Sequence, residues 1–335
     1  MQISVLDQSP QRSHISPDEA IRESLALAKA CEAFGYHRYW LSEHHNTSSI
    51  AGSAPEVLAA AIAATTSRIR VGAAGIMLPH YSALKVAEQF RVLEAIAPGR
   101  IDLGLGRAPG SDGRTALALN PNAGSGADNF PAQVRDLAAW VSGQPLPVDH
   151  PFRTIIAEPR GPHTPEIWIL GSSNYGAQLA AWYGLPYAFA YFFSDGAGAA
   201  EAMHIYHSQF RPSDSSLSRK RAAATIFAIA CETEAEAFYW AKSRAAFWGM
   251  RNRGQYIALP SPEEADQFDF SESEKARINL SLQRNFIGSA SQVADRLRAL
   301  GKELNLDEIA ITTAVHDQNV RTRSYELLAR EFGIL

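Results

Sequence analysis

Eight short apolar segments rich in β-forming residues recur along the chain, and helical patterns fill most of the intervals between them. The segments are Ile3–Asp7, Tyr39–Glu43, Val71–Leu78, Arg100–Arg107, Glu166–Ser172, Tyr187–Phe193, Thr225–Cys231 and Glu308–Val315. Their nearly continuous apolarity is typical of parallel strands that are covered on both faces. The pattern predicts an α/β protein, most simply a (β/α)8 TIM barrel, with a doubly wound open sheet as the alternative.

The spacing of these segments predicts how the barrel is organised. Residues 1–335 are expected to form a single domain, because α/β barrels of this size fold as one unit. The intervals after the fourth and seventh strands are longer than one βα unit requires, so they predict insertions at about 108–165 and 252–286. Ser16, Ser53 and Ser289 each precede a Glu or Gln at capping-box spacing and predict helix starts.

The charge and cysteine content of the chain argue against several classes of binding partner. The chain has 31 basic and 35 acidic residues, a net charge of −4 and no run of like charges, which argues against nucleic acid or an anionic membrane surface. Cys31 and Cys231 belong to no metal or disulfide pattern. The N-terminus lacks the apolar core of a signal peptide, and turn residues interrupt the charge-free stretch 167–194. We therefore expect a cytoplasmic protein with a small-molecule substrate.

In a barrel, functional side chains follow the carboxyl ends of the strands, and the second strand ends in Glu43, His44 and His45. Successive strand residues point to opposite faces, so one histidine is expected to face the pocket. An imidazole there can transfer a proton near neutral pH, although a histidine bonded to nearby backbone is the alternative. The same alternation keeps these three residues from converging on a metal, and no metal is predicted.

Arg107 follows the fourth strand and predicts a contact with phosphate, although a surface ion pair is equally compatible with its position. Pro109 stands where a dinucleotide-binding motif requires glycine, so the chain has no visible nicotinamide-binding fingerprint. The third strand has small residues at its middle, in the segment Val71–Pro79. They would admit a planar ligand or a neighbouring backbone, and close packing inside the barrel is the simpler explanation for them alone.

The fifth strand ends in the turn Gly171–Gly176, which opens a helix. Ser173 is suited to cap this helix, and the free amides and hydroxyls of a helix N-terminus bind anions. Strands four and five are expected to be neighbours, so Arg107, Ser172 and Ser173 can converge on one phosphate. This interpretation requires Arg107 and Ser173 to lie on the same side of the molecule.

The segments Trp40–His45, Val71–Pro79, Gly99–Arg107 and Gly171–Gly176 together resemble the bacterial luciferase-like flavin monooxygenase family. The resemblance covers nearly the whole chain, in the family's order and spacing, and includes Ile287–Ser289 before the helix that precedes the last strand. Each motif alone has little specificity, but the set is specific. The resemblance implies a TIM barrel that binds reduced FMN, adds O2 to form a flavin hydroperoxide, and oxidises a small organic substrate.

The resemblance also assigns roles to individual residues. His44 corresponds to the family's catalytic histidine, and Arg107 to the arginine that binds the FMN phosphate. The cofactor site would further include Ala74, Gly75, Ser172, Ser173 and Gly176, with the Ala74–Gly75 link matching a cis non-proline peptide beneath the flavin. We predict a substrate pocket that contains His45, Met77, Tyr191, Trp248 and Arg277, with Tyr191, Phe192, Phe247 and Trp248 as apolar walls and segment 252–286 as a lid.

Two differences from luciferase and the lack of a nicotinamide-binding motif limit the activity that the resemblance implies. Ser172 replaces an acidic residue of luciferase and Gly106 replaces a cysteine, so light emission is not implied. FMNH2 would come from a separate flavin reductase, and a homodimer is expected from the resemblance alone. The rival hypotheses are an F420-dependent dehydrogenase on the same fold and a flavin-binding barrel without catalysis. Substrate identity is not predicted.

Overall fold

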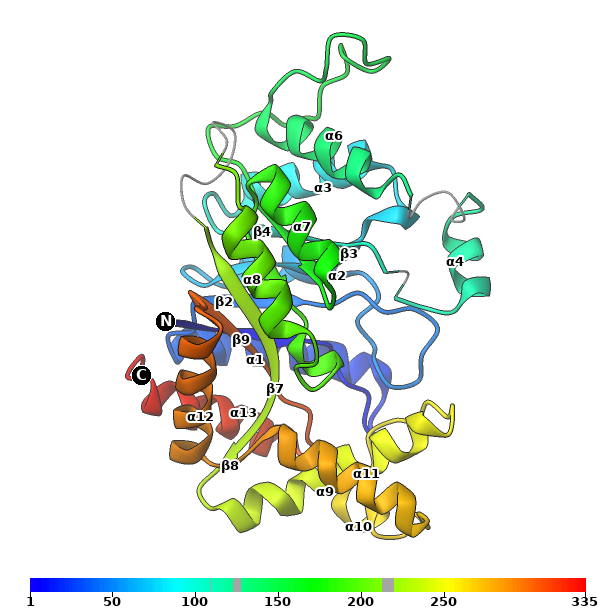
Figure 1. The fold of residues 1–335 in the computed structure, drawn as a ribbon, viewed down its shortest axis with the longest axis vertical. Coiled ribbons are helices and arrows are strands. Elements are labelled where there is room, and N and C mark those ends of the chain that lie inside the picture. Colours follow the sequence, from blue (N-terminus) through cyan, green and yellow to red (C-terminus); the bar gives the residue numbers. More distant parts are fainter. Residues whose placement is uncertain (109, 123–127, 213–219) are drawn as a thin grey trace.

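The computed structural model of the protein describes residues 1–108, 110–122, 128–212 and 220–335, and its strands form a closed barrel (Figure 1). Eight parallel strands follow one another around the barrel in the order β6-β5-β4-β3-β2-β1-β9-β7, and pairing between β6 and β7 closes it. Their bounds are β1 Gln2–Asp7, β2 Arg38–Leu41, β3 Arg70–Met77, β4 Ile101–Gly106, β5 Glu166–Gly171, β6 Tyr187–Phe189, β7 Ala222–Cys231 and β9 Glu308–Thr312. The predicted barrel is confirmed, and the open-sheet alternative is wrong.

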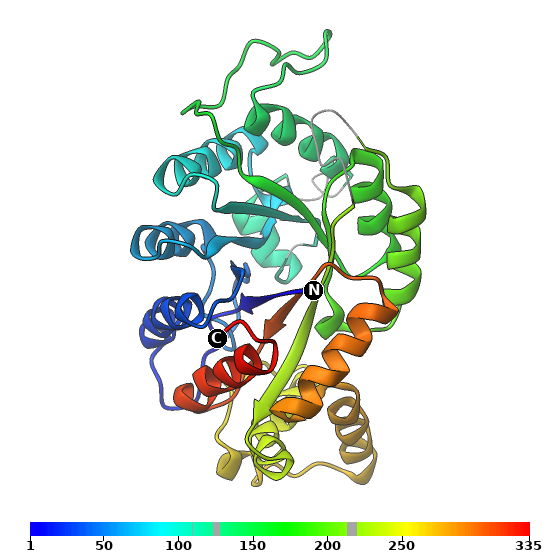
Figure 2. The ribbon, with the colours of Figure 1, turned by 90° about the vertical axis from the view of Figure 1, so that its left-hand side faces the viewer.

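Helices surround this barrel, and Figure 2 shows them on the outside of the strands. Those between the first five strands are α1 Pro17–Ala33, α2 Pro55–Thr65, α3 Ala83–Ile96, α4 Gly113–Leu119 and α6 Phe130–Ser142, with a short 3-10 turn η1 at Leu78–His80. Those that follow are α7 Asn174–Tyr183, α8 Ala199–Gln209, α9 Glu234–Asn252, α10 Pro262–Ala265, α11 Glu272–Arg284, α12 Ala290–Glu303 and α13 Gln318–Glu331, with a 3-10 turn η2 at Tyr191–Phe193.

The structure adds one strand that the sequence pattern did not predict. Strand β8, Phe286–Ser289, pairs in parallel with the last part of β7, Ala228–Cys231, outside the closed barrel. Three predicted strands run two or more residues too far, because β2 ends at Leu41, β6 at Phe189 and β9 at Thr312. The residues that follow these strands are therefore already loop or 3-10 turn, which frees their side chains from strict alternation.

Helix starts follow local capping for two of the three predicted serines. The Ser16 side chain accepts a hydrogen bond from the peptide N–H of Glu19, and Ser289 forms a full capping box that starts α12. The prediction at Ser53 is wrong, because Ala54 occupies the N-cap of α2 without a side-chain bond. Proline at the first helical position supplies the start signal instead, since its fixed φ suits that position.

The interior of the barrel is layered from its amino end upward. The lowest layer is charged and contains Ser4, Arg38, Arg70, Asp102, Glu166 and Glu308, which are linked by hydrogen bonds and ion pairs. The next layer is apolar and contains Leu6, Trp40, Trp168, Ala188, Ala223 and Ala310. Ala74, Leu170 and Phe192 pack against this apolar layer. Side chains thus fill the barrel, as expected for this fold, and leave function to its carboxyl rim.

The two predicted insertions contain helices. Segment 108–165 holds α4 and α6, and the part at 109 and 123–127 lies outside the described residues. Segment 252–286 holds α10 and α11, which lie beside α9 in Figure 1. No helix in the described part of the chain is long and apolar enough to cross a membrane.

Candidate active site

His44 lies just beyond the carboxyl end of β2, in the loop that leads to α2. Its peptide N–H donates to the carbonyl of Gly52 (3.0 Å), and its Nδ1 lies 3.2 Å from Ser42 Oγ. Burial, together with the charges of Arg251 on α9 and of His45, lowers the pKa of His44 to about 4. His44 is therefore a neutral imidazole at physiological pH, with Nε2 left to interact with a ligand.

His45 points into a different environment from His44 and is bound to a buried carboxylate. Its Nε2 lies 2.7 Å from Glu43 Oε1, and the hydroxyl of Tyr81 donates to that same oxygen (2.6 Å). The other Glu43 oxygen accepts from the peptide N–H of Met77 (2.9 Å). Glu43 thus links the ends of β2 and β3, a role that the sequence pattern does not predict because it depends on contacts with Met77 and Tyr81.

The glycines of β3 are explained by contacts inside the barrel. A Cβ on Gly72 would lie 1.9 Å from the carbonyl oxygen of Asp102, and one on Gly75 would lie 2.4 Å from Leu170 Cδ1. Neighbouring strands therefore occupy the space beside both residues, which supports the packing explanation. The Ala74–Gly75 peptide bond is cis, as the resemblance implies. Ala74 is partly exposed at the upper end of the interior.

The structure brings Arg107 and the start of α7 together on one side of the molecule. The Arg107 guanidinium lies 4.0 Å from the ring centre of Tyr175, which is in the first turn of α7. Ser173 is the N-cap, but its side chain makes no capping hydrogen bond, and both Ser172 and Ser173 are exposed. An exposed arginine, free hydroxyls and unpaired helix amides at one point are suited to bind a phosphate.

Gly176 contributes to the same part of the site, at the start of α7, by allowing close packing. A Cβ at this position would lie 3.2 Å from Tyr187 Cε2 and 3.4 Å from the Cα of Gly171. Glycine thus lets the first turn of α7 approach β5 closely. Because β4 and β5 are adjacent strands, this approach keeps Ser173 near Arg107.

Two residues assigned to the substrate pocket lie elsewhere. The Tyr191 ring contacts Phe286 of β8 at a centroid distance of 6.1 Å, whereas its neighbour Phe192 packs against the interior of the barrel. We therefore correct the prediction for Tyr191 and place Phe192 at the rim instead. Alternation was misjudged here because β6 ends early and a 3-10 turn follows. Arg277 is exposed on α11, and no contact in the described structure joins it to the rim.

Met77 and Trp248 do lie at the rim. A Cβ on Gly106 would lie 3.3 Å from Met77 Sδ, so the methionine bridges the ends of β3 and β4. Trp248 belongs to one face of α9 together with Arg244 and Arg251, at helical spacings of four and three residues. The Arg244 guanidinium lies 4.3 Å from the ring centre of Phe227, an inward-facing residue of β7. This face of α9 therefore covers the carboxyl end of the barrel.

The two arginines on this face were not predicted from the sequence. A signal existed, since residues 244, 248 and 251 recur at helical spacing and are all cationic or aromatic. Of these three residues, only Trp248 was assigned to the substrate pocket. The electrostatic effect of Arg251 on His44 shows that the α9 face and the loop after β2 border the same space.

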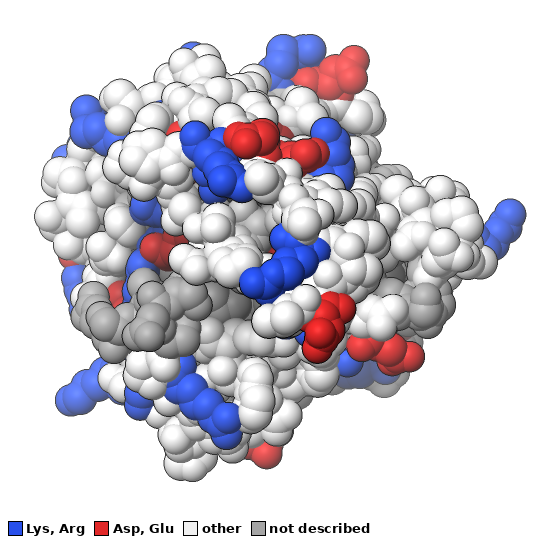
Figure 3. Space-filling view, turned by 90° about the horizontal axis from the view of Figure 1, so that it is seen from above, with Lys and Arg blue, Asp and Glu red and all other residues white. Residues whose placement is uncertain are grey.

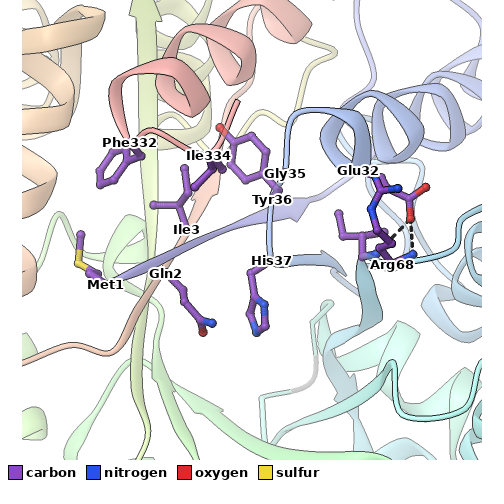
Figure 4. A pocket seen from close by; sticks show the side chains of 11 residues that line it. Met1, Gln2, Ile3, Glu32, Gly35, Tyr36, His37, Arg68, Phe332 and Ile334 are labelled. Atoms are coloured by element: carbon purple, nitrogen blue, oxygen red, sulfur yellow. Dashed lines mark hydrogen bonds between the residues drawn. The ribbon is translucent and has the colours of Figure 1, made fainter.

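A separate cavity of about 350 Å3 opens at the opposite, amino end of the barrel (Figure 4). It is lined by residues at or just before the starts of β1, β2 and β3 and by the C-terminal segment, including Met1, Gln2, His37 and Ile334. Glu32 at its edge accepts hydrogen bonds from the peptide N–H groups of Ser67, Arg68 and Ile69. The candidate catalytic and phosphate-binding residues all lie at the other end.

Comparison with known proteins shows which family the chain resembles over its length. A family model described as luciferase-like monooxygenase matches residues 1–308. The chain is 41% identical to a luciferase-like monooxygenase of Escherichia coli strain K12, over 97% of this chain and 95% of that protein. It is 32% identical to N-acetyl-S-alkylcysteine monooxygenase of Bacillus subtilis, over 98% of this chain and 97% of that protein.

Solved structures give the same result. The crystal structure of apo-MsnO8 superimposes with a TM-score of 0.90 at 34% identity, covering 100% of this chain and 99% of that one. The oxygenating constituent of 3,6-diketocamphane monooxygenase in complex with FMN (TM-score 0.73, 19% identity, 99% and 97% coverage) shares the fold. An F420-dependent secondary alcohol dehydrogenase (0.66, 14%, 98% and 97%) also shares it. With full-length relatives at this identity, the chain belongs to the luciferase-like monooxygenase family of oxidoreductases.

Proposed function

We propose that this protein is an FMN-dependent monooxygenase that uses reduced flavin and O2 to oxidise a small organic substrate. The observation that carries the proposal is the phosphate-binding arrangement at the ends of β4 and β5. Arg107 stacks on Tyr175 and has no carboxylate partner among the described residues, while the Ser173 hydroxyl is not used for capping. A full-length relative named as a monooxygenase, and a shared fold with an FMN complex, give further support.

The fit of the site to FMN rests on residues at three strand ends. Arg107 and Ser173 would hold the phosphate, with Ser172 and Gly176 beside them, and Ala74 and Gly75 would lie beneath the ring system. The bound reduced flavin would supply the two electrons with which O2 is split between the oxidised substrate and water. The protein's own contribution is to position the reactants and to exclude water from them.

His44 would hold or accept a proton at Nε2, because Nδ1 lies beside Ser42 Oγ. Its lowered pKa keeps the imidazole neutral at physiological pH, so it can accept a hydrogen bond. Phe192, Met77 and Trp248 would provide apolar surroundings for the reactants. His45 would stabilise the ends of β2 and β3 through its contact with Glu43.

The remaining parts of the proposal concern partners. We expect FMNH2 to be delivered by a separate flavin reductase in the cytoplasm, and we expect the protein to act as a homodimer. On the face drawn in Figure 3, basic and acidic side chains are interspersed rather than gathered into one field. Such a surface offers no strong electrostatic steering of a charged macromolecule.

An anaerobic titration with FMNH2, followed by release into oxygenated buffer, tests the proposal. We expect saturable binding and O2-dependent oxidation of candidate substrates that is lost in His44→Gln. Tighter binding of F420 than of FMNH2 would instead establish the deazaflavin dehydrogenase. Flavin binding without O2-dependent turnover, with His44→Gln indistinguishable from the natural protein, would identify a barrel without catalysis.

A further inference from the structure

Helix α9 presents a cationic face to the space above the barrel. Arg244, Trp248 and Arg251 lie on one side of this helix, with the Trp248 ring 5.0 Å from the Arg244 guanidinium and 4.9 Å from that of Arg251. Arg244 lies over the inward-facing ring of Phe227 at the end of β7. The face therefore closes the site on the side of β7 and β6.

Arg244 is buried without a counter-ion. Its side chain is only 8% exposed, its Nε has no hydrogen-bond partner, and no carboxylate in the described structure lies within ion-pair distance. Asp195 acts on it through space, but the Asp195 oxygens accept hydrogen bonds from Ser281 (3.0 Å) and Asn285 (3.4 Å). Burying an unpaired guanidinium is costly, so a protein that keeps one gains something from it.

A second donor beside Arg244 is also unpartnered. The indole Nε1 of Trp248 is buried and has no acceptor among the described residues. Arg251, at the next turn of the helix, is part-buried and likewise has no carboxylate partner there. Two buried donors and two positive charges therefore lie together on this face of α9, and the described residues offer the two donors no acceptor.

We propose that the substrate of this protein carries a carboxylate, which binds to Arg244 and to the indole N–H of Trp248. This inference rests on the proposed function, because it assigns the substrate class of that same site. A guanidinium and a carboxylate match in charge and planar geometry. The FMN phosphate is assigned to Arg107 at the ends of β4 and β5, which leaves Arg244 for a different anion. Phe192 is partly buried and packs against the cluster that contains Phe227, so it supplies an apolar surface for the remainder of such a substrate.

Matched ligands on the full-length protein provide the test. Octanoate and octanamide have the same chain length and differ in charge, so calorimetric titration of each, with and without saturating FMN, isolates the contribution of the carboxylate. We expect octanoate to bind the natural protein about tenfold more tightly or better, as for a charge-assisted pair. The preference should be lost in Arg244→Met and partly kept in Arg244→Lys.

Two controls separate this role from a structural one. Lys242→Met removes one positive charge from α9, at an exposed ion pair with Asp266, and should leave the octanoate preference unchanged. Thermal unfolding of ligand-free Arg244→Met should occur at or above the temperature of the natural protein, since an unpaired buried charge is removed. A large loss of stability in that variant would indicate a structural arginine and would overturn the proposal.

The remaining outcomes are equally decisive. Failure of the natural protein to bind octanoate at millimolar concentration, or equal binding of octanoate and octanamide, would overturn the proposal. So would an Arg244→Met variant that keeps the preference but loses affinity for FMNH2, because Arg244 would then serve the flavin. Absent FMN binding together with a carboxylate preference that depends on Arg244 would reject the proposed function but confirm the carboxylate site itself.

Discussion

Arg38 at the amino end of the barrel and Arg244 near its carboxyl end are both buried, but only Arg38 has counter-ions. Arg38 lies 2.7 Å from Asp102, 2.9 Å from Glu308 and 3.2 Å from Glu166. Although burial opposes its charge, these carboxylates raise the pKa of Arg38 above its ordinary value. For Arg244, burial dominates and, with the charge of Arg251, lowers the pKa to about 9.

This difference in pairing distinguishes a structural role for charged residues at the amino end of the barrel from a ligand-binding role at its carboxyl end. At the amino end, charges are paired with each other and linked across β1, β2, β4 and β9, so they close the sheet. At the carboxyl end, Arg107, Arg244 and Arg251 have no carboxylate partner among the described residues, so their donors remain available to a ligand. Paired charges at one end and unpaired charges at the other are consistent with a barrel whose loops carry its chemistry.

The largest expected effect comes from removing an arginine from the buried ion pairs at the amino end of the barrel. Arg38→Met should destabilise folding by about 3–5 kcal/mol, because it leaves Asp102 and Glu308 buried without their partner. Urea unfolding monitored by tryptophan fluorescence measures this change. The comparison sharpens if Arg244→Met, which makes the same replacement at the other end, shows no such loss. Equal destabilisation by both variants would contradict the distinction between the two ends.

A smaller effect is expected for the arginine that would bind the FMN phosphate. Arg107→Ala should weaken FMN binding by about 1.5–3 kcal/mol, the value of a hydrogen bond to a charged group. Riboflavin has the same ring system without the phosphate, so its affinity should hardly change. Flavin fluorescence titrations of both ligands measure the two effects. Equal weakening for FMN and riboflavin would show that Arg107 does not act on the phosphate.

The pH dependence of folding tests the environment of His44. Its pKa is about 4 in the folded protein against an ordinary value of about 6.5, so between these values the unfolded chain binds the proton more strongly. Stability should therefore fall as pH decreases through this window, by about 2 kcal/mol between pH 7 and 5 from His44 alone. Unfolding curves of His44→Gln should lack this contribution. Parallel pH profiles for the two proteins would show that His44 is not desolvated.

The smallest effect is expected on the outer face of α9. Lys242 pairs with Asp266 at 2.7 Å, but both side chains are exposed. Lys242→Met should change the free energy of unfolding by less than about 0.5 kcal/mol, as for most exposed ion pairs. Thermal unfolding in low and high salt measures it. A change as large as that for Arg38 would mean that burial does not explain the contrast between the two ends.

Most of the rim could be predicted because it follows directly from strand ends. His44, Arg107 and Ser173 stand immediately after β2, β4 and β5, and parallel strands bring such residues to one edge. Tyr191 was misplaced because the prediction carried β6 past its observed end, where a 3-10 turn reverses which ring faces inward. Arg277 was assigned by resemblance, and its helix α11 presents Ile278 rather than Arg277 to the core.

The order of apolar strand segments and helix starts by itself determined the barrel, since each βα unit is encoded by local periodicity and capping. It also brought His44, Arg107 and Ser173, which follow strand ends, to the carboxyl rim. Only the tertiary structure decided which arginines are paired. Whether a guanidinium meets a carboxylate depends on contacts between residues far apart in the chain, such as Arg38 with Glu308, and no local pattern records the absence of one at Arg244.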